Sequence, residues 1–151
     1  MINSRFFHLI LLTSVCAFLF VYCEEQQQAS EYDPGESRFA MGDTLVVTGT
    51  LIDAHCYALD KSNTGHDHQL PQSGFRENCA EYCALQGYPV AVLFENEQGA
   101  DEVWSIMTTP LIFADYMIQT VRVKGTVRTD GVLDPLSVEL MSGPDEWITI
   151  M

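Results

Sequence analysis

The sequence predicts one mainly β domain, a small barrel of five or six strands with two short helices. Two observations carry the β class. Short runs rich in β-branched residues alternate at a period of two, and stretches rich in glycine, proline and asparagine separate them. Two further segments carry helix start or stop signals. With 151 residues, 47% of them hydrophobic, the chain has enough apolar side chains for one packed core.

The N-terminal part is expected to lie outside this domain. Residues 1–22 join a basic residue to an apolar run and resemble a lipoprotein-type signal peptide. Cys23 would then carry the lipid, although Tyr22 stands where bacterial lipoproteins usually have a small residue. Residues 23–41 are acidic and turn-rich and predict a disordered tether, which leaves 42–151 for the barrel domain. We therefore expect export to a bacterial cell envelope, with the membrane as a partner through the lipid.

The first half of the domain contains one strand, a loop and a helix. Alternating Leu, Val, Thr and Ile predict a strand over residues 45–52. Residues 60–74 are dense in Asp, Asn, Ser, Gly and Pro and predict a loop. A short helix is predicted over residues 76–86, because a glycine and then a proline follow it.

The second half predicts a hairpin, a helix and two strands. The hairpin comes from the runs PVAVLFE and EVWSIM, and Thr109 with Pro110 predicts the start of the second helix. Residues 120–128 alternate cleanly, LDPLSVELM gives a last strand, and WITIM extends the sheet or covers its end. This order matches an oligonucleotide/oligosaccharide-binding (OB) barrel, which has a helix between its third and fourth strands. Another barrel or an open sandwich would give much the same order.

Three cysteines carry the strongest chemical signal. Cys79 and Cys83 stand four residues apart on the predicted helix, where Cβ atoms are about 5–6 Å apart. An unstrained disulfide needs roughly 3.5–4.5 Å, whereas two thiolates on one metal ion tolerate the wider gap. Cys56 offers a third thiolate. Because thiolates favour soft ions, we expect zinc or copper.

Other side chains near the cysteines are candidates for the same site. His66 and His68 lie in the predicted loop and could supply a further ligand, although histidines in polar loops are often only solvated. Asp53 is expected to orient a ligand, or else to form a turn at the end of the strand. Tyr57 is expected to be a neighbour of the cluster.

Two other interpretations of the cysteines stay open. A disulfide from Cys56 to Cys79 or Cys83 would staple the helix to the first strand and leave one free thiol, as suits an exported chain. The protein would then be a structural or ligand-binding barrel. Alternatively, Cys79 near the helix start could act as a redox thiol, with one of the other cysteines resolving it. No hydrolase motif is present, so an enzymatic role is uncertain and is the weaker expectation.

The charge of the chain restricts its partners. Its net charge is -14, from 21 acidic and 7 basic residues. Such a chain is repelled by phosphate backbones and favours cations. We therefore expect no nucleic-acid partner.

The motifs resemble those of small exported bacterial proteins of OB-like fold, a largely uncharacterised group. The similar stretches, within about residues 44–141, are VTGTLIDAHCY, NCAEYC, QGYPVAVL and VRVKGTV. They contain a D-x-x-C-Y element and a C-A-x-x-C element followed by G-x-P. The resemblance implies an OB-like fold, export and a cysteine cluster at one end of the barrel, but no reaction. The group tends to have a histidine shortly before the paired cysteines, and here GFREN stands there, so His66 or His68 would have to replace it. The residues that correspond to the cluster are Asp53, Cys56, Tyr57, Cys79, Cys83, Gly87 and Pro89.

Overall fold

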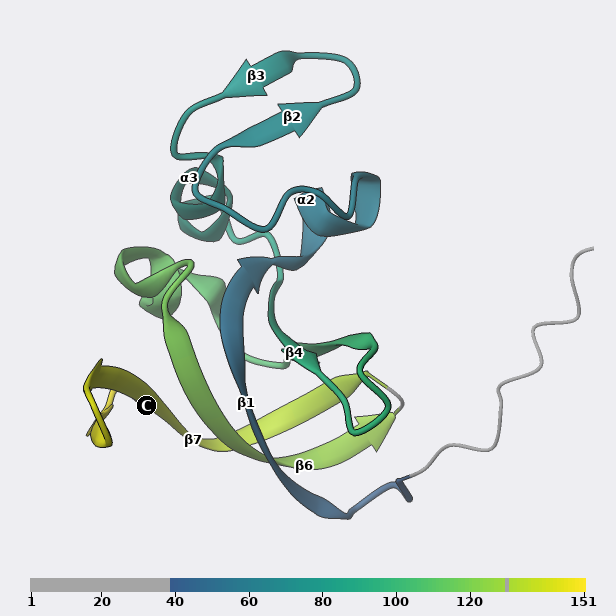
Figure 1. The fold of residues 1–151 in the computed structure, drawn as a ribbon, viewed down its shortest axis with the longest axis vertical. Helices are drawn as coiled ribbons and strands as arrows, with labels where there is room; N and C mark the ends of the chain where they lie inside the picture. The colour runs from purple at the N-terminus through teal and green to yellow at the C-terminus, as the bar shows by residue number, and fades with distance from the viewer. Residues whose placement is uncertain (1–38, 130) are drawn as a thin grey trace, which may run out of the picture. The chain divides into compact units, whose positions relative to one another are not determined.

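Six strands form one sheet in the computed structural model, which describes residues 39–129 and 131–151. The strands are β1 (Thr44–Asp53), β4 (Val90–Glu95), β5 (Asp101–Ile106), β6 (Thr120–Thr129), β7 (Val132–Gly143) and β8 (Glu146–Thr149). Their order is β5-β4-β1-β6-β7-β8, and β5 also pairs in parallel with β7. Hydrogen bonding therefore closes a ring through five strands, and β8 pairs with β7 of this ring. Figure 1 shows the long strands β1, β6 and β7 of the ring. The predicted mainly β class is confirmed.

The predicted signal peptide, the lipidation site Cys23 and nearly all of the predicted tether lie outside the described residues. At the start of the described chain, Phe39 packs edge-on against Trp104, with ring centroids 5.5 Å apart. Within residues 39–129 and 131–151, no helix is long and apolar enough to cross a membrane.

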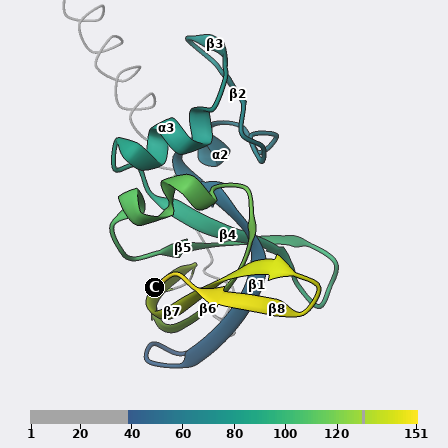
Figure 2. The ribbon, with the colours of Figure 1, turned by 90° about the vertical axis from the view of Figure 1, so that its left-hand side faces the viewer.

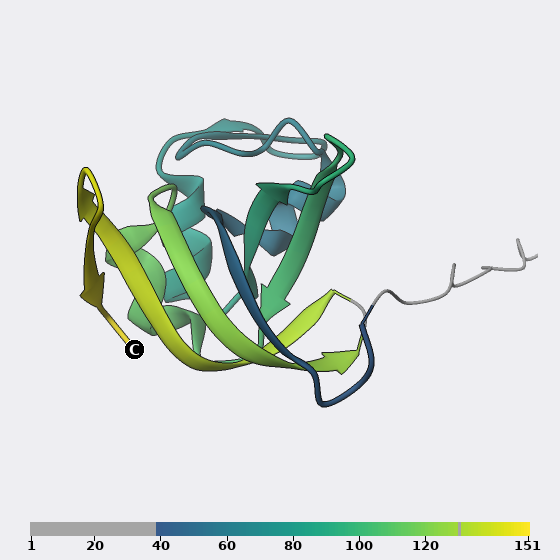
Figure 3. The same cartoon turned by 60° about the horizontal axis from the view of Figure 1, so that its bottom comes forward.

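The core forms where alternating strands turn their apolar side chains inward. On β6 the predicted alternation is confirmed, since Val121, Val123 and Val127 are buried while Lys124 and Arg128 are exposed. Figure 3 shows β1, β6 and β7 curving together around this interior. The larger buried core side chains are Val47, Leu51, Val90, Val92, Trp104, Ile106, Phe113, Met117, Val121, Val123, Val127, Leu133 and Val138.

The described residues contain three helices where the sequence predicted two. These are α2 (Ala54–Leu59), α3 (Cys79–Leu85) and the 3-10 helix η1 (Pro110–Tyr116), which begins after Thr109 as predicted. Helix α2 was missed because six residues are too few for a helical repeat of apolar side chains to show. Asp53 starts it, since its side chain accepts hydrogen bonds from the backbone N–H groups of His55 and Cys56.

The helix predicted over residues 76–86 begins later in the structure. Residues Gly74–Arg76 form β3 instead, which pairs with β2 (His68–Leu70). Asn78 then takes a left-handed φ of 47° and turns the chain into α3. The predicted start near residue 76 was therefore wrong, and the predicted loop over 60–74 holds a short β-strand.

The elements between β1 and β4 gather at one end of the sheet. Figures 1 and 2 both show α2, α3 and the β2–β3 hairpin together beyond the end of β1. Helix α3 packs against η1 and against β1. The chain segments that carry all three domain cysteines therefore meet at this end.

Gly49 on β1 permits the close approach of β4. A Cβ atom at this position would lie 2.2 Å from the carbonyl oxygen of Leu93 and 2.9 Å from the Cβ of Phe94. We expect Gly49→Ala to lower the free energy of unfolding by about 1–3 kcal/mol or more, because the backbone of β4 would have to move. Urea unfolding of the full chain measures this. Gly65→Ala is the matched control, since its Cβ would meet no atom within 4 Å; equal losses in both variants would contradict the prediction.

Candidate metal centre

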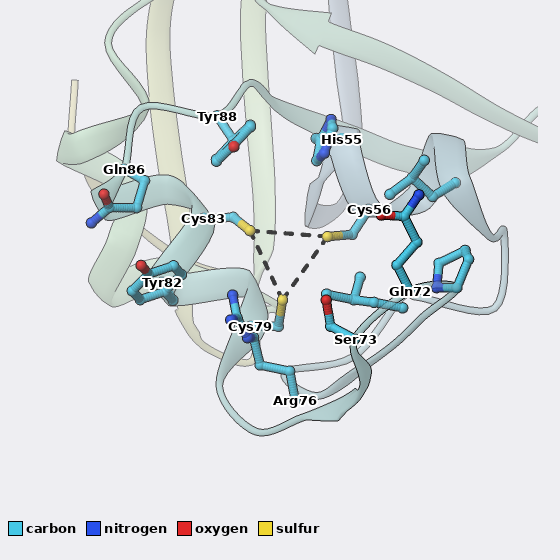
Figure 4. A pocket seen from close by; sticks show the side chains of 13 residues that line it. His55, Cys56, Gln72, Ser73, Arg76, Cys79, Tyr82, Cys83, Gln86 and Tyr88 are labelled. Carbon is cyan, nitrogen blue, oxygen red and sulfur yellow. Dashed lines mark hydrogen bonds between the residues drawn. The ribbon is translucent and has the colours of Figure 1, made fainter.

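Three buried thiols meet between α2 and α3 (Figure 4). The Sγ atoms of Cys56, Cys79 and Cys83 are 3.9–4.0 Å apart in all three pairs, and we call them the sulfur triangle. The three residues are at most 5% exposed. A point at the centre of such a triangle lies about 2.3 Å from each sulfur, which is the usual zinc–sulfur bond length. The geometry therefore suits one ion shared by three thiolates.

The staple predicted as an alternative is not formed. All three cysteines are free thiols in the structure. A disulfide needs two sulfurs about 2.05 Å apart, and the nearly equal separations favour no pair over another. The three sulfurs are thus arranged as three ligands of one ion would be.

Hydrogen bonds from the preceding loop position α3 and its two cysteines. The N–H of Ala80 donates to the carbonyl of His66 at 3.1 Å, and the N–H of Asn78 donates to Asp67 Oδ1 at 2.8 Å. These bonds satisfy amides at the start of the helix. Cys79 and Cys83, one turn apart, then lie on the buried face of α3, as the spacing predicted.

Asp53 is a fourth potential ligand. Its Oδ1 caps α2, at 2.9 Å from the N of His55 and 3.1 Å from the N of Cys56. Its Oδ2 is buried and has no hydrogen-bond partner in the structure. One carboxylate oxygen of Asp53 and the three sulfurs all lie within 4.8 Å of one another. The sequence predicted that Asp53 orients a ligand, whereas its position also allows it to bind the ion directly.

His68 lies beside Asp53 and does not belong to the group of potential ligands. Its ring is buried, its Nε2 is 3.0 Å from the carbonyl of Gly65, and its Nδ1 is 3.7 Å from Asp53 Oδ2. A carbonyl can only accept, so Nε2 is the donor of this hydrogen bond. Neither His68 Nδ1 nor Asp53 Oδ2 has a hydrogen-bond partner. A cation near Asp53 would give Oδ2 the partner that it lacks.

The structure does not bring the other predicted site residues into the group of potential ligands. His66 is exposed and pairs with Glu81. Tyr57 is half-buried on α2. Neither belongs to the group of potential ligands that the described residues bring together, and the same holds for His68. Both histidines remain predictions as ligands.

Asn63 fixes the loop that carries the two histidines. It is buried, and its Nδ2 donates to the carbonyls of Cys56 at 3.0 Å and Gln69 at 3.3 Å. Its Oδ1 accepts from the N–H of Gln69 at 2.9 Å. This side chain therefore joins α2 to β2, and the sequence alone gave no signal for it because the contact depends on the tertiary fold.

Burial disfavours the charged form of the thiols. It raises the pKa of Cys83 to about 12, and the carboxylate of Asp53 adds to the shift. The pKa of Cys56 is raised further, again first by burial and then by Asp53. These two thiols are therefore protonated at neutral pH when no cation is near. A bound metal ion reverses the balance, since a coordinating thiol loses its proton.

The thiols are reached through a pocket of about 620 Å³. Its lining includes all three cysteines of the sulfur triangle (Figure 4). His55, stacked on Tyr88 with ring centroids 4.6 Å apart, forms part of the wall. Because α2 begins at Ala54, both His55 and Cys56 line the pocket.

Comparison with protein-family models, with curated proteins and with solved structures finds no match for the chain. The resemblance to small exported OB-like proteins stays a prediction. The function is therefore inferred from the chemistry of Asp53 and the sulfur triangle.

Proposed function

We propose that the protein binds one thiophilic metal ion, zinc or copper(I), in the sulfur triangle. The observation that carries this proposal is the equal 3.9–4.0 Å spacing of the three buried sulfurs, which suits a single ion at their centre. Soft thiolates select such ions over calcium or magnesium. The unpartnered oxygen of Asp53 adds a negative group that a cation would satisfy.

Asp53 makes zinc the better fit of the two metals. Zinc accepts carboxylate oxygen together with sulfur and usually takes four ligands in proteins. One carboxylate oxygen of Asp53 lies within 4.8 Å of the three sulfurs, and Oδ2 has no hydrogen-bond partner. Copper(I) is satisfied by three thiolates, and it would leave Asp53 to act through its charge alone.

We also propose that the domain is an OB-like barrel on an exported, lipid-anchored chain. Support for the fold comes from η1, which follows β5 and precedes β6 and thus lies between the third and fourth strands of the five-stranded ring. Support for export comes from the apolar run that ends at Cys23 and from the acidic, turn-rich segment after it.

Metal content of the purified chain tests the binding proposal directly. We expect about one equivalent of zinc or copper after purification without chelator or metal-binding tag, and loss of most of it in Cys83→Ser, because the triangle would keep only two thiolates. Elemental analysis with a thiol count under denaturing conditions measures both.

The control for this test is Cys23→Ser, which removes a cysteine outside the proposed site and should keep the metal. Unchanged metal in Cys83→Ser would show that the ligand assignment is wrong. Absence of metal together with one free thiol among Cys56, Cys79 and Cys83 would instead support the structural staple.

A second variant separates the two metals. Asn caps a helix about as well as Asp, so Asp53→Asn should keep α2 while it removes the carboxylate charge. We expect the zinc affinity to fall by about tenfold or more, and the copper(I) affinity to change less, because only zinc would use the carboxylate as a ligand. Competition titrations with a chromophoric chelator measure this. Asp115→Asn, on the exposed face of η1, is the control, and a zinc affinity that Asp53→Asn leaves unchanged would exclude Asp53 as a ligand.

Lipid anchoring is tested by detergent partition of the chain expressed in a bacterial host. The intact chain should enter the detergent phase and incorporate labelled fatty acid, because a diacylated cysteine binds membranes stably. Cys23→Ser should lose the label, whereas Cys16→Ser should keep it. Equal labelling of the intact chain and the Cys23→Ser variant would contradict the proposal.

A further inference from the structure

The pocket gives access to one side of the sulfur triangle only. Cys56, Cys79 and Cys83 all line it, whereas Asp53 and His68 do not. Asp53 Oδ2 and His68 Nδ1 are buried. The triangle therefore has a closed side toward Asp53 and an open side toward the pocket.

An ion at the centre of the triangle would be reachable from that open side. Three sulfurs 3.9–4.0 Å apart place an ion with bonds of about 2.3 Å close to their plane. An ion in this position can take a ligand on each side of the plane, and Asp53 serves only one of them. Zinc that binds an external ligand usually takes it beside three protein ligands and can expand from four to five ligands.

The size of the pocket indicates an organic ligand. Its volume of about 620 Å³ lies within the ~300–1,000 Å³ of typical small-molecule sites and far exceeds the ~30 Å³ of one water molecule. Leu59, Leu70, Tyr82 and Tyr88 give it apolar and aromatic walls, and the polar side chains of Gln72, Ser73 and Gln86 lie among them. Figure 4 shows the labelled residues of this set arranged around the three sulfurs.

Arg76 gives the pocket a positive group. Its guanidinium lies over the ring of Tyr82, 5.2 Å from the centroid. Within the described parts of the chain no carboxylate pairs with Arg76, although Arg122 and Arg128 both form ion pairs. In a chain of net charge -14, an arginine beside a pocket and without an acidic partner is available to pair with an external anion.

We propose that the pocket binds a small organic thiol that also bears a carboxylate. This inference rests on the proposed metal site. The thiolate of the ligand would bind the metal on the open side of the sulfur triangle, and its carboxylate would pair with Arg76. Sulfur is the donor that a soft ion held by three thiolates prefers, and a carboxylate is the group that a guanidinium binds in bidentate fashion. On binding, the thiol of the ligand loses its proton to solvent and no electrons are transferred.

Three related probes test the two contacts separately. The full chain is loaded with one equivalent of Co²⁺, whose visible spectrum reports changes of its ligands, and is titrated with 3-mercaptopropionate, 2-mercaptoethanol or propionate. We expect 3-mercaptopropionate to change the spectrum at a concentration at least tenfold lower than 2-mercaptoethanol, because only the former can also pair with Arg76. Propionate alone should leave the spectrum unchanged.

Two variants show whether Arg76 supplies the difference. Arg76→Gln should still bind cobalt but should respond equally to the two thiols. Lys124→Gln removes the same charge from an exposed position on β6 and should keep the tenfold preference. The inference would be overturned if the unaltered chain responded equally to the two thiols, or if Arg76→Gln kept the preference. It would also be overturned if the thiols released cobalt into the small-molecule fraction. A chain that takes up no cobalt and no zinc would instead overturn the divalent metal site itself, and this inference with it.

Discussion

The arrangement of the site depends on Asp53, which caps α2 with one carboxylate oxygen and buries the other. Oδ1 accepts hydrogen bonds from the first free amides of α2 and thereby sets the position of Cys56, while Oδ2 is buried 3.7 Å from His68 Nδ1 without a hydrogen-bond partner. One side chain thus builds the third corner of the sulfur triangle and places a negative charge beside it. A residue that only capped the helix would not need its second oxygen buried.

This placement makes the site sensitive to cations. Two thiols have raised pKa values because they are buried and because Asp53 is close, so the metal-free site holds protons where the metal-bound site would hold thiolates. Metal binding must therefore release protons, and the apparent affinity falls as the pH falls. Without an ion, the carboxylate of Asp53 repels thiolates and so favours the protonated thiols. With a cation bound, the same carboxylate attracts the cation.

Local sequence patterns predicted the parts of this site that depend on short spacings. Cys79 and Cys83 share a helical face because they are four residues apart, and the β6 strand followed from its alternation. Helix α2 could not be predicted, since one capping aspartate before six residues is no stronger a signal than a turn. The contacts of His68 with Asp53 and of Asn63 with Cys56 join segments whose approach depends on the hairpin of β2 and β3. Such contacts carry no periodic signal.

The sulfur triangle is held together by bonds that need no metal. Asn63 ties α2 to β2, the carbonyl of His66 accepts the N–H of Ala80 in α3, and the N–H of Ala54 donates to the carbonyl of Pro89 before β4. In domains that fold only with zinc, the metal supplies the links that the core lacks. Here the ring of strands has its own core and the ligand-bearing helices are already attached to it. A metal ion in the triangle would therefore add to helices that the core and these hydrogen bonds already attach, rather than supply the missing core.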